Sequence, residues 1–71
     1  MSRVFVLFFS TNHAMWAEEI LTAKGISARV VPVPRHLSSD CGYCLEIPES
    51  EAGESEAILK EESVEYDRIG S

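Results

Sequence analysis

The chain has 71 residues and a formal net charge of −6, from 12 acidic and 6 basic side chains. A chain of this length supports one small hydrophobic core, so we expect a single domain over residues 1–71 without a deep internal cavity. The acids gather between residues 46 and 67 and the bases are scattered, which disfavours nucleic-acid binding because phosphate-binding proteins present a basic stripe.

No membrane association is expected from the sequence. The longest apolar run, Val4 to Phe9, is far too short to cross a bilayer. Residues 1 to 9 also lack the charged, long apolar and small-residue regions of a signal peptide, so we expect a cytoplasmic protein. Thiols stay reduced in that compartment, and the two cysteines therefore predict chemistry, metal binding or packing rather than a disulfide staple.

The first predicted elements are a strand and a helix. Arg3 to Phe9 is almost entirely β-branched and aromatic, which is typical of a central strand. Ser10, Thr11 and Asn12 follow with side chains that cap helices, and Gly25 suits the left-handed residue after a helix. The segment between Ser10 and Gly25 therefore predicts a helix of about three turns.

Two further strands are predicted on either side of a long loop. The second strand covers Ala28 to Val33 and ends at prolines, which cannot donate ladder hydrogen bonds. The third covers Tyr43 to Ile47, and its alternation places Leu45 and Cys44 on opposite faces, with Glu46 on the side of Cys44. We therefore expect Cys44 to lie on a face less apolar than the core.

A second helix and a fourth strand complete the chain. The helix is expected to begin near Ser50, with Ala57, Ile58 and Val64 as its apolar anchors. Val64 to Ile69 alternates and is loaded with charge, as edge strands often are. The order βαββαβ predicts an α+β, ferredoxin-like fold with two helices packed on one face of a four-stranded antiparallel sheet.

This fold also predicts where the loop between the second and third strands lies. We expect the second strand to run opposite to the first, which places the loop where the first strand begins and the helices end. Ser10 to His13 are then expected at the other end, too far away to act with the loop. A thiol in that position would lack the help that a helix N-terminus gives to thiolate formation.

The loop contains both cysteines and most of the residues that resemble a known family. The resemblance rests on Thr11, His13, Glu18, Leu21, Gly25, Pro32, Pro34-Arg35, Leu37-Ser38-Ser39 and Cys41-Gly42. On these residues the chain resembles the putative selenium/sulfur carrier protein-like family of small bacterial domains, over nearly its whole length. The resemblance implies that Cys41 carries sulfur or selenium as a persulfide or selenosulfide, and that the protein is a carrier more than an enzyme. It also implies a partner, a cysteine desulfurase or a selenium- or sulfur-utilising enzyme.

The residues themselves fit a carrier. A sulfur carrier needs a nucleophilic thiolate that stays accessible. An irregular loop that presents Cys41 beside Gly42, which has no side chain, meets the access requirement. We expect no cofactor and no bound metal. The residues expected to assist the thiol or to bind an anion are Arg35, His36, Ser38, Ser39 and Gly42.

Cys44 departs from the family pattern. We expect it to act, if at all, as a resolving thiol that releases sulfur from Cys41, because a bridge leading into a strand would be strained. The spacing Cys41-Gly42-Tyr43-Cys44 also leaves open a weak thiol redox protein. A metal site, with His36 as third ligand and a dimer to complete it, is a further alternative.

A different class of function also fits the sequence. The domain is then a small protein-interaction or regulatory module, and Cys41 is only structural. Met15 and Trp16 on the first helix are candidates for a homodimer contact.

Overall fold

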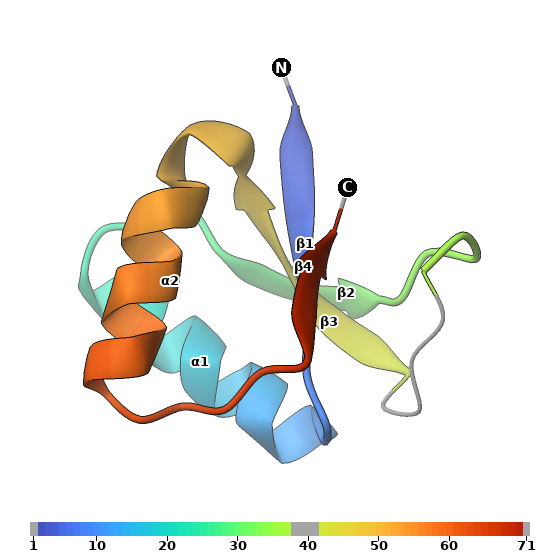
Figure 1. The fold of residues 1–71 in the computed structure, drawn as a ribbon, viewed down its shortest axis with the longest axis horizontal. Helices are drawn as coiled ribbons and strands as arrows, with labels where there is room; N and C mark the ends of the chain where they lie inside the picture. Colours follow the sequence, from blue (N-terminus) through green and yellow to red (C-terminus); the bar gives the residue numbers. More distant parts are fainter. Residues whose placement is uncertain (1, 38–41, 71) are drawn as a thin grey trace.

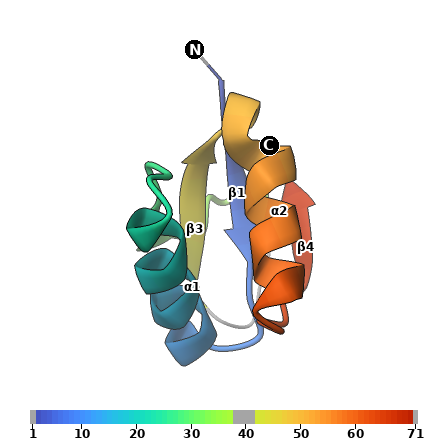
Figure 2. The same cartoon turned by 90° about the vertical axis from the view of Figure 1, so that its left-hand side faces the viewer.

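The computed structural model describes residues 2–37 and 42–70. Its four strands form one antiparallel sheet in the order β2-β3-β1-β4. Both helices lie on the same face of this sheet (Figures 1 and 2). This is the predicted α+β, ferredoxin-like arrangement. In chain order the elements are β1 (Arg3–Leu7), α1 (Thr11–Ala23), β2 (Arg29–Pro32), β3 (Tyr43–Pro48), a short 3₁₀ helix η1 (Glu49–Glu51), α2 (Ala52–Glu61) and β4 (Arg68–Gly70).

The strands β1 and β2 run in the same direction, so the predicted direction of the second strand is wrong. Both are antiparallel to β3, which lies between them. The physical reason is the crossover through α1, which returns the chain to the end of the sheet from which β1 started. Leu7 near the end of β1 and Val31 near the end of β2 both pair with Cys44 near the start of β3.

The β2–β3 connection therefore leaves the sheet at the end where β1 finishes and α1 begins (Figure 1). The sequence-based expectation placed it at the opposite end, away from Ser10 to His13, and this placement is also wrong. The C-terminal end of α2 lies here too, because β4 starts at Arg68 opposite Leu7. We call this end of the molecule the loop end.

The helix α1 forms where the sequence predicts it. The hydroxyl of Ser10 caps the helix by accepting the backbone N–H of His13 at 3.3 Å. Gly25 has a φ of +86°, a conformation that glycine adopts without strain and that ends helices. The buried residues of the helix are Ala14, Ala17 and Leu21.

The helix α2 is anchored only in part by the predicted residues, since Ile58 packs against the core but Ala57 does not. Ser55 and Leu59 are its buried residues, one turn apart on one face, whereas Ala57 is exposed and Ile58 is half-buried. Val64 is buried as expected, but it lies after the helix and before the short strand β4.

Within the described residues, no helix has the length and apolar character that a membrane crossing requires.

The core lies between the helices and the sheet. Alternate residues of the two central strands point into it and meet the buried faces of both helices. Phe8, directly after β1, adds the largest fully buried side chain. The members of the core that come from strands and helices include Val4, Val6, Leu45, Ile47, Leu21 and Leu59.

Candidate functional site

The face of the sheet that no helix covers has two different halves. At the loop end, Leu7 of β1 and Cys44 of β3 pair directly and are both 0% exposed. Further from the loop end, the same face carries Arg3, Arg29 and Glu46. We call these two areas the apolar half and the charged half. Cys44 thus shares its face with Glu46, as alternation predicts, but its own surroundings are as buried as the core.

The chain that follows β2 lies against this helix-free face, which we call the open face, and we call its residues 33–37 the covering segment. The backbone N–H of Val33 donates to the carbonyl oxygen of Gly42 at 3.1 Å, and that of Leu37 donates to Pro34 at 3.0 Å. Leu37 Cδ2 lies 3.1 Å from the position that a Cβ on Gly70 would occupy. Because β2 and β4 are the two edges of the sheet, this contact links the chain that follows one edge strand to the other edge strand. A side chain at position 70 would require Leu37 to shift by a few tenths of an ångström.

The predicted site residues fall into two groups. Arg35 and His36 are exposed in the turn between Pro34 and Leu37. Gly42 is exposed, with a φ of +82° that favours glycine. Cys41, Ser38 and Ser39 lie outside the described residues, so their roles stay predictions.

Cys44 is placed where no large reagent reaches it. It lies in a central strand between Leu7 of β1 and Val31 of β2, and its side chain is completely buried. Access to this thiol requires the side chains that bury it to move away. Any role for Cys44 as a resolving thiol depends on such a movement.

The first turn of α1 belongs to the same end as the loop, which sequence reasoning missed. Ser10 Oγ and His13 Nδ1 are 2.6 Å apart, and the rings of His13 and Trp16 have centroids 6.5 Å apart. The N-terminus of α1 contributes partial positive charge here and the C-terminus of α2 partial negative charge. The rule that β-α-β crossovers join parallel strands is the signal that locates these residues correctly.

Exposed hydrophobic side chains gather in segments that start or finish at the loop end. Phe9 follows β1, Tyr43 begins β3, and Met15 and Trp16 lie in the first half of α1. Their exposures range from 46% for Tyr43 to 62% for Phe9. We call these four residues the hydrophobic end. Large exposed apolar side chains of this kind often mark contacts with another protein.

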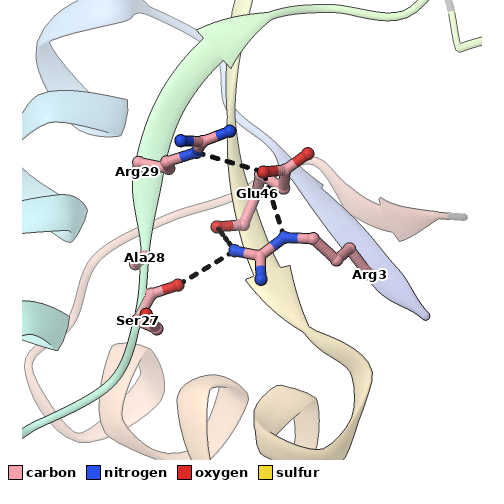
Figure 3. Close-up of a pocket in the computed structure, with 5 residues that line it drawn as sticks. All are labelled: Arg3, Ser27, Ala28, Arg29 and Glu46. Carbon is pink, nitrogen blue, oxygen red and sulfur yellow. Dashed lines mark hydrogen bonds and ion pairs between the residues drawn. The ribbon is translucent and has the colours of Figure 1, made fainter. Parts of the chain in front are cut away.

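The charged half contains a depression lined by two arginines and one glutamate. Arg3 and Arg29 contact the same carboxylate oxygen of Glu46, at 3.0 and 3.2 Å (Figure 3). The remaining lining residues are Ser27 and Ala28.

Within residues 2–37 and 42–70, no group of three or more His, Cys, Asp or Glu residues is placed to hold a metal ion.

Comparison with models of known protein families identifies the family of this chain. The family model described as "Putative Se/S carrier protein-like" matches residues 3–70, which is nearly the whole chain, and this agrees with the resemblance in the sequence. Neither the curated proteins nor the solved structures contain a significant match.

Proposed function

The chain belongs to the Putative Se/S carrier protein-like family, and from this premise we propose that it holds sulfur or selenium on Cys41 and delivers it to a partner enzyme. The observation that carries the proposal is the complete burial of the other thiol, Cys44. A cargo thiol has to meet both a donor and an acceptor. The role therefore falls to Cys41, whose neighbour Gly42 is exposed.

The loading step is a transfer between thiols. The thiolate of Cys41 attacks the outer sulfur of a persulfide on a donor such as a cysteine desulfurase. The donor's S–S bond breaks, its thiolate leaves with the electron pair, and Cys41 becomes the persulfide. A selenosulfide on a donor transfers its selenium atom in the same way. No external oxidant or reductant is consumed in either case.

The exposed side chains of the covering segment suit a role beside this cargo. A persulfide is anionic once its outer sulfur loses a proton, and Arg35 and His36 precede the cysteine in the same connection. Arg35 offers a permanent positive charge with several N–H donors. We assign these two residues to stabilising the loaded form, with Ser38, Ser39 and the backbone near Gly42 as further donors.

Delivery uses either an acceptor enzyme or the second cysteine. An acceptor thiolate attacks the outer sulfur and leaves Cys41 as the thiolate. Alternatively, Cys44 attacks the inner sulfur, forms a disulfide with Cys41 and releases hydrosulfide. The second route needs Cys44 to leave its buried position, so we expect it to be slow while Leu37 lies against Gly70.

The test is loading by an enzymatic donor. Reduced protein is incubated with a cysteine desulfurase and cysteine, and its intact mass is recorded. We expect the wild type and Cys44→Ser to gain the mass of one sulfur atom, and Cys41→Ser to gain none. If Cys41→Ser loads as well as the wild type, the proposal is wrong. If the protein is instead an interaction module with a structural Cys41, no variant loads, and partner binding survives Cys41→Ser.

A further inference from the structure

The charged half of the open face contains hydrogen-bond donors that the fold does not use. Arg29 contacts Glu46 only through Nε, at 3.2 Å, and 71% of its side chain is exposed. Arg3 is more constrained, since its Nη2 donates to the carbonyl oxygens of Ser27 at 3.1 Å and Glu46 at 3.4 Å. Among the described residues, Nη1 of Arg3 and both Nη groups of Arg29 have no hydrogen-bond acceptor.

The pairing of Arg3 with Glu46 is itself incomplete. Arg3 Nε lies 3.0 Å from Glu46 Oε1, which makes an ion pair. The Nε atom is nevertheless buried without a hydrogen bond, so its N–H is not directed at that oxygen. The ion pair with Glu46 therefore holds the Arg3 guanidinium in place by charge and not by a hydrogen bond from Nε.

The local charge is positive in an otherwise acidic protein. Two guanidinium groups and one carboxylate line the depression, which leaves one positive charge in excess, whereas the whole chain has a formal net charge of −6. The carboxylate of Glu51 accepts the backbone N–H of Ser27 at 3.4 Å but does not line the depression. The excess charge is therefore not neutralised by a second lining acid.

We propose that this depression is a binding site for a small oxyanion, taken up between the guanidinium groups of Arg3 and Arg29. Guanidinium groups recognise an anion with two oxygens on one centre through paired N–H donors. The depression, of about 320 Å³, is large enough for such an ion and is open to solvent (Figure 3). Arg29 is exposed and turns toward the ion, whereas Glu46 keeps Arg3 in position and competes with the ion. The site does not depend on the chemistry of Cys41.

The proposal is tested by titrating the protein with sodium sulfate and, separately, sodium acetate, while sodium chloride keeps the ionic strength constant. NMR signals of Ser27, Arg29 and Glu46 should shift and saturate. Arg29→Gln should weaken binding about tenfold because it removes charge-assisted hydrogen bonds. Glu46→Gln should tighten binding about threefold or more, since a neutral amide competes less well than a carboxylate.

The matched control is Arg68→Gln, which removes an exposed arginine from β4. This variant should bind like the wild type. Saturation by sulfate alone identifies a tetrahedral oxyanion as the ligand, and saturation by both ions identifies a carboxylate-like group as sufficient. The proposal is overturned if neither ion saturates the shifts, or if Arg29→Gln and Arg68→Gln respond equally. Melting temperatures of all variants check that each one is folded.

Discussion

Leu7 of β1 and Cys44 of β3 are direct partners across the sheet, and both are fully buried on the face that no helix covers. The sheet is therefore packed on both faces at the loop end. Next to this pair, Leu37 of the connection after β2 lies against Gly70 of β4, which is opposite Phe5 of β1. We infer that Leu37 contributes to the cover over Cys44.

Removing the side chain of Leu37 should expose Cys44. In a Cys41→Ser background, Leu37→Ala should raise the rate at which a thiol reagent labels the native protein by about tenfold. The reason is that a half-buried leucine stabilises the covering segment by about 1–2 kcal/mol. Leu37→Met, which keeps an apolar side chain of similar volume, is the control and should label like the parent. Equal labelling of Leu37→Ala and its parent would show that Leu37 does not protect Cys44.

Cys44 should not tolerate a larger side chain. Cys44→Leu adds volume at a completely buried position and should lower the free energy of unfolding by about 1–3 kcal/mol, because an overpacked core forces its neighbours to shift. Cys44→Ala removes a single heavy atom and should cost less. Urea unfolding of the two variants measures the difference. A leucine variant as stable as the alanine variant would contradict the complete burial of this position.

Tyr66 joins the segment before β4 to α2 through a hydrogen bond that titrates. Its hydroxyl donates to Glu56 Oε2 at 2.6 Å. This bond to Glu56, together with burial and the negative charge of Glu56, raises the pKa of Tyr66 from 10.0 to about 12. Because the pKa is higher in the folded state, the associated stability is present below pH 10 and is lost as the pH rises toward about 12.

The measurement is an ultraviolet titration of Tyr43→Phe, in which Tyr66 is the only tyrosine. We expect its midpoint near pH 12, and a lower midpoint after the additional change Glu56→Gln. Tyr66→Phe should reduce the free energy of unfolding at neutral pH by about 0.5–1.5 kcal/mol. A midpoint of 10.0 in the Tyr43→Phe protein would contradict the claim that the hydrogen bond to Glu56 raises the pKa of Tyr66.

The order of the elements could be predicted from local patterns, because each pattern carries its own physical cause. Capping at Ser10, the left-handed conformation at Gly25 and alternation along β3 all appear in the structure. The direction of β2 could not be obtained from its own residues, since it is set by the crossover through α1. The direction of β2 decides which residues lie near the loop between β2 and β3.

The packing of the open face could be predicted only in part. Alternation correctly predicts that Cys44 and Glu46 lie on the same face of the sheet. Alternation does not predict that a loop packs against this face. The contact between Leu37 and Gly70 joins positions far apart in the sequence, and no local sequence pattern predicts it. The same holds for Arg3 and Glu46, which meet only because β1 pairs with β3.

The hydrophobic end should matter for transfer between proteins and not for the chemistry of the thiol. Trp16→Ala should slow loading from a cysteine desulfurase by on the order of tenfold, because aromatic residues contribute strongly to protein interfaces. Loading from a small persulfide should be unchanged. Lys24→Ala, at the other end of α1, is the control for a general surface effect. Equal slowing of both reactions by Trp16→Ala would indicate a folding defect and not a docking role.

The measurement that tests the central claim most directly is the position of the transferred atom in the chain. After enzymatic loading with isotopically labelled cysteine, the remaining thiols are blocked, the protein is digested and the peptides are analysed by mass spectrometry. The account predicts one labelled sulfur on Cys41, with Cys44 unmodified unless the protein is unfolded before blocking. Labelled sulfur on Cys44 of the folded protein, or on neither cysteine, would contradict it.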